Sequence, residues 1–175
     1  NKPISLANTR IDFTFLGKAA HAATAPHLGR SALDAVELMN VGVNYMREHI
    51  PDSARIHYAY MDSGGNAANV VQAKATVRHL IRASNLQELR SLVDRVYKIS
   101  DGAALMTETN VEKKVYSGVS NLLGNVVLEK IMQSEWDKLG PVKFDKNDIK
   151  FANKIRSTFT ENDIKDSFQR IGIKA

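Results

Sequence analysis

Residues 54–84, ARIHYAYMDSGGNAANVVQAKATVRHLIRAS, contain two strand patterns separated by a turn. Alternation places Ile56, Tyr58 and Tyr60 on one face of the first strand, 54–61. KATVRHLIRA predicts the second strand, which ends near Arg82. The intervening DSGGN has two glycines, which tolerate positive φ and favour a turn. The centre of the chain is therefore expected to form two consecutive strands.

Helix and strand signals flank this pair symmetrically. RIDFTFL, 10–16, alternates as a half-buried strand, and Ser31 with Asp34 begins a helix that we expect to run to about Ile50, before Pro51. Asn85 with Glu88 begins a second helix, and NVEKKVYSG, 110–118, predicts a fourth strand. The order βαββαβ over about 10–118 predicts an α+β fold, a ferredoxin-like sandwich with a four-stranded antiparallel sheet and two helices on one face.

The rest of the chain changes character and predicts a helical C-terminal tail. A helix-like segment ends at Gly140-Pro141, and Asp145/Asp148 and Thr160/Asp163 are start signals for two further helices. The apolar stripes of these helices are weak, so we expect them to lie against something outside this chain. We therefore divide the chain into a domain of residues 1–119 and a helical segment of residues 120–175.

Composition excludes several classes of protein. The 175 residues are 43% hydrophobic and 25% charged, which is typical of a globular protein, and the absence of cysteine excludes disulfides and thiolate metal sites. No apolar run approaches the roughly 20 residues needed to cross a bilayer, and no export signal is present, so we expect a cytoplasmic protein. The net charge of +5 is spread along the chain, which predicts neither a nucleic-acid nor a membrane partner. The start, NKPISL, lacks an initiator Met and suggests an excerpt from a longer protein.

Three side chains are candidates for chemistry. His21 follows a predicted strand among four alanines, so a ligand could approach its imidazole closely; an ordinary exposed loop histidine is the alternative. Asn69 precedes the third strand, and Arg82 ends it, where a guanidinium can bind a carboxylate or simply remain a surface cation. His21 and His27 are six residues apart with no nearby carboxylate, so we predict no metal site in this chain.

Three segments taken together carry a resemblance to a known family: GKAAHAATAPHLGRSALDAVELM, NVVQAKATVRHLIRA and ISDGAALMTET. They resemble the lid, or dimerisation, domain of the co-catalytic metallo-amidohydrolases, which include aminoacylases, glutamate carboxypeptidases and indoleacetyl-amino-acid hydrolases. The resemblance implies that His21 reaches the partner subunit's active site and stabilises the tetrahedral oxyanion. It also implies that Asn69 contacts substrate and that Arg82 binds the substrate's terminal carboxylate.

The same resemblance implies an enzyme larger than this chain. The complete protein would cleave a small-molecule N-acyl or aroyl amino acid amide of the p-aminobenzoyl-glutamate type, with two divalent metal ions, zinc or manganese, in a separate catalytic domain. The ligand motifs for those ions are absent from these 175 residues. We therefore expect the isolated fragment to be inactive.

The strand at 54–61 predicts self-association. It is expected at an edge of the sheet, and it has no proline, lysine or central glycine that would prevent pairing with another strand. We predict a homodimer in which this edge strand and the helix at 31–50 meet their twofold-related copies.

Two functions without catalysis remain as alternatives. RNA-recognition domains share the βαββαβ order, but their third strand carries stacking aromatics, and ATVRHLIRA has none. A free-standing ferredoxin-like binding or assembly module has no such requirement and stays open.

Overall fold

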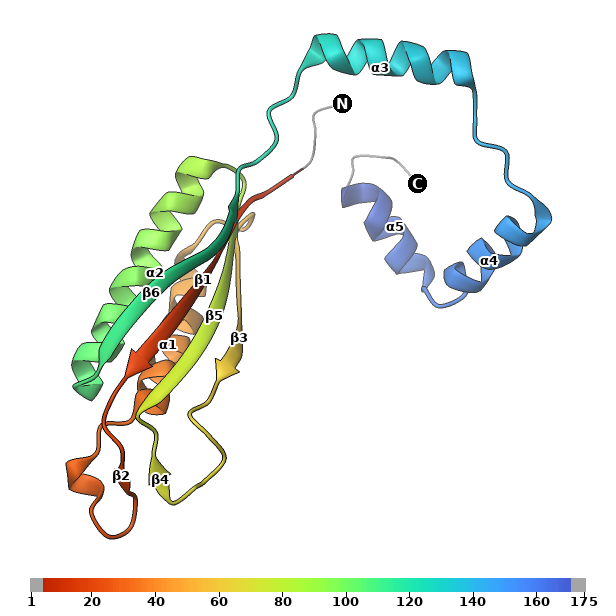
Figure 1. Cartoon of the computed structure of the whole chain (residues 1–175). Helices are drawn as coiled ribbons and strands as arrows, with labels where there is room; N and C mark the ends of the chain where they lie inside the picture. The colour runs from red at the N-terminus through yellow and green to blue at the C-terminus, as the bar shows by residue number, and fades with distance from the viewer. Residues whose placement is uncertain (1–4, 171–175) are drawn as a thin grey trace. The chain divides into compact units, whose positions relative to one another are not determined.

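The computed structural model describes residues 5–170 and contains the predicted βαββαβ domain (Figure 1). The four long strands are β1 (Ala7–Leu16), β3 (Arg55–Asp62), β5 (Lys74–Ala83) and β6 (Asn110–Val119). They form one antiparallel sheet in the order β3-β5-β1-β6, and helices α1 and α2 cover the same face of it. The ferredoxin-like fold expected from the sequence is confirmed.

The core lies between that sheet and the two helices. The burial of β1 alternates along its length, and Ile11, Phe13 and Phe15 are fully buried on the helix-facing side. Val77 and Ile81 of β5 continue the same layer. The other face of the sheet carries mostly polar and charged residues, so one face packs and the other is open.

Helix α1 (Ala32–Met46) begins where the sequence predicts and ends earlier than expected. The Ser31 side chain accepts a hydrogen bond from the backbone N–H of Asp34 at 3.0 Å. After Met46 the chain tightens into a 3₁₀ turn, Arg47–His49, so the α-helix itself does not reach Ile50. The Arg47 side chain donates to the carbonyl of Ile56 at 2.7 and 3.1 Å, which fixes the start of β3 under this turn.

Helix α2 (Leu86–Thr107) has the predicted start, because Asn85 accepts a hydrogen bond from the N–H of Glu88 at 2.9 Å. The helix ends at Thr107 and is capped by Glu108, a non-glycine residue with φ of 54°. The two helices pack closely at Gly42 of α1, where a Cβ would lie 2.8 Å from the Ile99 side chain of α2. The small residue therefore sets the approach of the two helices.

The two outer strands of the sheet differ. The ladder between β6 and β1 shifts register between Arg10 and Ile11, so β6 carries a bulge at Tyr116. The ladder between β3 and β5 also shifts, but only near its end, between Tyr60 and Asp62. Most of β3 is therefore a regular strand with one unpaired edge.

A small polar network is buried beneath β3. His79 on β5 is fully buried, and its Nε2 lies 3.1 Å from Oδ1 of Asn40 on α1. The Asn40 Nδ2 donates to the Tyr60 hydroxyl at 3.3 Å, and the Tyr58 ring lies 5.3 Å from the imidazole. Because the amide oxygen only accepts, the Nε2 of His79 carries the proton, and Nδ1 is buried with no hydrogen-bond partner among residues 5–170.

The second unit begins at Leu123 and contains the three expected tail helices. These are α3 (Val126–Leu139), α4 (Lys146–Arg156) and α5 (Glu161–Arg170). Asn125 caps α3, and Asp145 with Asp148 forms a complete capping box on α4. No side chain of α3 or α4 is buried. Over the described range, none of the helices is long and apolar enough to span a membrane.

Candidate functional site

His21 is held at one end of the sheet by a set of backbone hydrogen bonds. After β1, the Gly17 N–H donates to the carbonyl of Ala73 at 2.7 Å, and Lys18 pairs with Arg30 across the base of the loop. The short strand β2 (Ala20–His21) then pairs with β4 (Val70–Val71). The loop is therefore tied to the segment that precedes β5, and His21 has a defined position.

The imidazole of His21 is exposed, and its local contacts determine its tautomer. Its Nδ1 accepts hydrogen bonds from the backbone N–H groups of Ala23, at 3.2 Å, and Thr24, at 3.1 Å. A ring nitrogen that accepts cannot carry the proton, so in the neutral ring Nε2–H is the donor. The loop thus presents an N–H donor to whatever lies in front of it, as stabilisation of an oxyanion requires.

Asn69 lies beside His21. Its carbonyl accepts a hydrogen bond from the N–H of Ala22 at 2.9 Å, directly after the β2–β4 pair, and its side chain is exposed. The structure therefore brings together two of the three predicted site residues.

Arg82 lies at the opposite end of the sheet. It pairs in register with Asn8 of β1 and Arg55 of β3, whereas Lys74, eight residues earlier on β5, pairs with Leu16 next to the His21 loop. At about 3.4 Å per residue, Arg82 is roughly 27 Å from the His21 end of β5. One copy of the chain cannot bring Arg82 and His21 to the same small molecule.

The base of the His21 loop is too tight for a side chain at Gly17. A Cβ there would lie 2.0 Å from the backbone oxygen of Arg30, so Gly17→Ala is expected to lower the free energy of unfolding by about 1–3 kcal/mol. At Gly118 a Cβ would meet only Thr9 and Asn8, at 3.8 and 3.9 Å. Gly118→Ala is therefore expected to raise the free energy of unfolding by about 0.4–1 kcal/mol, because alanine restricts the unfolded chain. Urea unfolding followed by circular dichroism measures both variants. Equal effects of the two substitutions would contradict this packing.

The described residues do not fit a metal site. Within residues 5–170, no group of three or more histidine, aspartate or glutamate side chains is arranged to hold an ion. The Nδ1 of His21 already accepts from the backbone N–H groups of Ala23 and Thr24, so its lone pair is not free for a metal ion.

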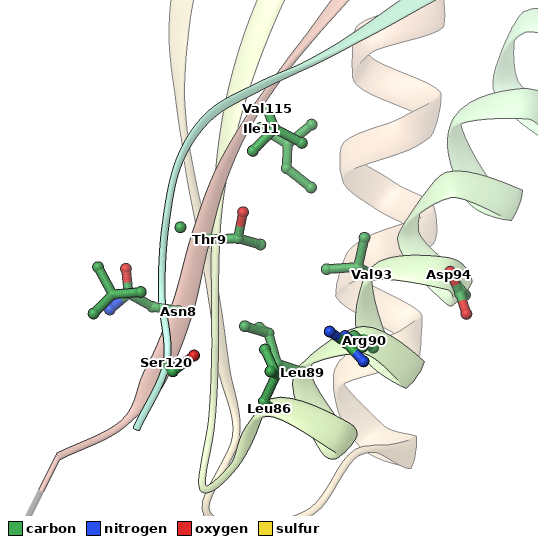
Figure 2. Close-up of a pocket in the computed structure, with 12 residues that line it drawn as sticks. Asn8, Thr9, Ile11, Leu86, Leu89, Arg90, Val93, Asp94, Val115 and Ser120 are labelled. Carbon is green, nitrogen blue, oxygen red and sulfur yellow. The ribbon is translucent and has the colours of Figure 1, made fainter. Parts of the chain in front are cut away.

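A cavity of about 280 Å³ lies away from these residues, between the first turns of α2 and strands β1 and β6 (Figure 2). Ile11, Leu89 and Val93 give it an apolar lining, and Gly118 contributes no side chain to fill it. None of His21, Asn69 and Arg82 lines this cavity. It is an open depression beside the bulge of β6, apart from the predicted site.

Two features of this region could not be predicted from the sequence. The β2–β4 pair is too short to give an alternating pattern, so the adjacency of His21 and Asn69 was not expected. The hydrogen bonds to the His21 Nδ1 come from main-chain groups, for which a sequence gives no signal beyond the small residues of the loop.

Comparison with known proteins identifies relatives that match most of the chain. The family described as the peptidase dimerisation domain matches residues 8–105. One of the two subunits of the p-aminobenzoyl-glutamate hydrolase of Escherichia coli (strain K12) is 47% identical over 167 residues, which are 95% of this chain and 35% of that protein. A homolog of the other p-aminobenzoyl-glutamate hydrolase subunit, from Haemophilus influenzae, is 27% identical over 73% of this chain and 30% of its own length.

Solved structures show the same fold. The aminobenzoyl-glutamate utilization protein from Klebsiella pneumoniae superimposes with a TM-score of 0.64 at 24% identity, over 74% of this chain and 33% of that one. This chain spans about a third of the length of the curated relatives that it matches. The residues that match the family, 8–105, run from the second residue of β1 through α1, β3 and β5 and include most of α2. The chain belongs to the peptidase dimerisation domain family, in the amidohydrolase group that includes the p-aminobenzoyl-glutamate hydrolases.

Proposed function

We propose that this chain supplies the lid and the dimer contacts of an amide hydrolase whose active site is completed by two subunits. The observation that carries the proposal is the separation of the site residues, with His21 and Asn69 at one end of the sheet and Arg82 at the other. A single substrate can meet all three only if it lies between two copies.

A twofold axis beside β3 would place His21 of one copy and Arg82 of the other near the same substrate. β3 begins opposite Arg82 and ends opposite Thr76, next to the His21 end of the sheet. If two β3 strands pair antiparallel, the start of one lies beside the end of the other. The partner subunit's His21 then approaches the Arg82 end of the first protomer.

Each side chain has a defined task in this site. The partner subunit's His21 donates its Nε2–H to the oxygen that becomes negative when the amide carbonyl is attacked. Arg82 binds the terminal carboxylate of the substrate through its guanidinium. The partner subunit's Asn69, which lies beside the partner subunit's His21, contacts the substrate with its side chain. These contacts hold and polarise the amide, and the groups that activate water lie outside this chain.

The substrate is an N-acyl or aroyl amino acid amide of the p-aminobenzoyl-glutamate type, and the hydrolase is cytoplasmic. The 47% identity to one component of a p-aminobenzoyl-glutamate hydrolase supports this substrate class. Two divalent metal ions, zinc or manganese, belong to the complete enzyme and are held by residues outside this chain. The isolated chain is accordingly inactive.

The tail, residues 120–175, leads back toward the catalytic domain, whereas residues 1–119 form the lid. Large apolar side chains of its helices are exposed, among them Met132, Trp136 and Phe151. In water such side chains favour burial against another surface. The remainder of the enzyme provides that surface.

The dimer can be tested on this chain directly. Tyr45 on α1 is 74% exposed and Met61 on β3 is 51% exposed, and both belong to the surface that meets its copy. The unmodified chain is expected to sediment as a dimer at a protein concentration of about 100 µM. This concentration exceeds the micromolar dissociation constants that are typical of weaker specific interfaces. Tyr45→Lys combined with Met61→Lys is expected to sediment as a monomer, because pairing would bury two lysine ammonium groups per protomer without a counter-charge.

Leu105→Lys is the matched control, because Leu105 is 81% exposed near the end of α2, away from the β3 edge. That variant is expected to remain a dimer. An unmodified chain that is monomeric at this concentration contradicts the homodimer. Association only after addition of the other hydrolase component, of the Haemophilus influenzae type, would assign the same surface to a heteromeric assembly instead.

A further inference from the structure

Among residues 5–170, one non-glycine residue has a positive φ, and it follows the last turn of α2. This residue is Glu108, with φ of 54° and ψ of 37°. The N–H of Thr109 donates to the carbonyl of Ala104 at 3.0 Å, beside a longer contact from the Glu108 N–H to Leu105 at 3.4 Å. These two bonds form the Schellman arrangement of a helix end, in which the left-handed position is usually glycine because glycine has no Cβ. A glutamate at this position therefore adopts a backbone conformation that opposes folding.

The side chain of Glu108 makes a contact that glycine cannot make. Its Oε2 accepts a hydrogen bond from the Nε of Arg30 at 2.8 Å. The Nη1 of Arg30 donates in turn to the carbonyls of Gly29, at 2.7 Å, and His27, at 3.3 Å. The Arg30 guanidinium thus joins the end of α2 to the segment by which the His21 loop returns to the sheet.

Arg30 also closes the base of that loop. Its backbone forms two hydrogen bonds with the backbone of Lys18, at 2.8 and 2.9 Å. Between Lys18 and Arg30 lie His21 and the N–H groups of Ala23 and Thr24 that hold its Nδ1. A displacement of Arg30 therefore changes the direction in which the imidazole points.

The contact between Arg30 and Glu108 contributes little to the stability of the domain. The two side chains are 39% and 71% exposed, and exposed ion pairs are weak and are screened by salt. The backbone of Glu108 acts in the opposite direction, against folding. The loop geometry that this pair fixes accounts for a glutamate at this position, whereas stability favours glycine.

We propose that Glu108 and Arg30 are positioning residues for His21, which hold the loop so that the Nε2–H of the imidazole meets the reacting amide. The inference rests on the proposed function, in which His21 stabilises the oxyanion. Because the rate of a reaction depends steeply on the placement of such a donor, a small displacement of the loop lowers kcat while the fold stays intact. Activity and stability are thus expected to change in different directions at Glu108.

The first test uses this chain alone. Glu108→Gly removes the carboxylate and suits the left-handed backbone, so its Tm is expected to equal or exceed that of the unmodified chain. Amide hydrogen exchange, followed by NMR, is expected to become about threefold faster or more at Ala23 and Thr24 and to stay unchanged at Val77 in the core. Glu108→Gln keeps an oxygen that accepts from Arg30 and is expected to exchange like the unmodified chain. Unchanged exchange at Ala23 and Thr24 in Glu108→Gly overturns the proposal.

The second test uses the complete hydrolase. Glu108→Gly is expected to lower kcat about tenfold and to leave KM nearly unchanged, a part of the effect of removing the imidazole itself. In a His21→Ala background the same substitution is expected to have no further effect, because Glu108 acts through that ring. Asp101→Asn is the matched control, since it removes an exposed ion pair of α2, with Lys113 on β6, that does not touch the loop. It is expected to leave kcat unchanged.

The two tests separate this inference from the proposed function. If His21→Ala lowers kcat and Glu108→Gly does not, the positioning role is wrong and the role of His21 stands. If Glu108→Gly lowers kcat equally with and without the imidazole, Glu108 does not act through His21, and the proposal is overturned. If His21→Ala leaves kcat unchanged, the proposed function is wrong, and hydrogen exchange at Ala23 and Thr24 still decides whether the pair holds the loop.

Discussion

Replacing His21 with alanine is expected to lower the kcat of the complete hydrolase by roughly 10²–10³, the effect of losing one donor to a developing oxyanion. The reason is geometric, because Nδ1 is occupied by the N–H groups of Ala23 and Thr24, which leaves Nε2–H as the donor. The loop that carries it is anchored by backbone hydrogen bonds and should keep its shape without the ring. KM is expected to change much less than kcat, since the contact strengthens only in the transition state.

Mixed dimers distinguish action within one protomer from action between two. His21→Ala and Arg82→Ala protomers are each expected to form dimers of low activity. When the two are mixed and exchanged, a heterodimer has one site with both residues intact and one site with neither, so about a quarter of the wild-type activity should return. If mixing restores nothing, His21 and Arg82 do not serve the same site from opposite protomers.

Acid is expected to destabilise the domain through His79, by about 3 kcal/mol between pH 6.5 and pH 4. Burial, with a smaller contribution from the charge of Arg47, lowers the pKa of His79 from 6.5 to about 4. Between pH 6.5 and pH 4 the unfolded chain therefore binds a proton at His79 that the folded chain does not bind. The contribution of neutral His79 to the free energy of unfolding is complete above pH 6.5 and is lost as the pH falls. The buried Nδ1, which has no acceptor beside it within residues 5–170, is the position that would have to be protonated.

A double variant isolates this contribution from the carboxylates that also titrate in acid. His79→Leu with Asn40→Leu removes the histidine together with its hydrogen-bond partner, so the loss of the imidazole does not leave the buried Asn40 amide without its partner. Urea unfolding at several pH values is expected to give a steeper loss of stability in the wild type than in the double variant. Parallel pH profiles for the two proteins would show that His79 does not titrate differently on folding.

The parts of the fold that depend on local signals were predictable from the sequence. Ser31 and Asn85 cap the helices that they were expected to begin, because a cap is an interaction between residues three positions apart. The strand alternation that predicted the buried face of β1 also holds, because it follows from the two-residue period of an extended chain. The early end of α1 at Met46 was not predicted, since it depends on a contact between Arg47 and Ile56 on the next strand.

The candidate site was only partly predictable, for a related reason. The resemblance that identifies His21, Asn69 and Arg82 does not say how far apart these residues lie. The distance between Arg82 and the His21 loop follows from the register of β1 with β5. The pairing of Arg82 with Arg55 likewise needs the register of β3 with β5. In the sequence, His79 is indistinguishable from an ordinary strand residue. Its hydrogen bond with Asn40 on α1 depends on how the helix packs on the sheet. Contacts between distant segments cannot be read from spacing alone.

The bulge at Tyr116 has a consequence for how far such sheets can grow. Two domains joined through β3 leave only β6 at either outside border, and there the bulge breaks the regular ladder while Lys113 and Lys114 lie in the same strand. A third copy would find no straight, uncharged strand to extend. A pair formed through β3, as proposed, would therefore be self-limiting: it would admit one neighbour and would not propagate into a filament.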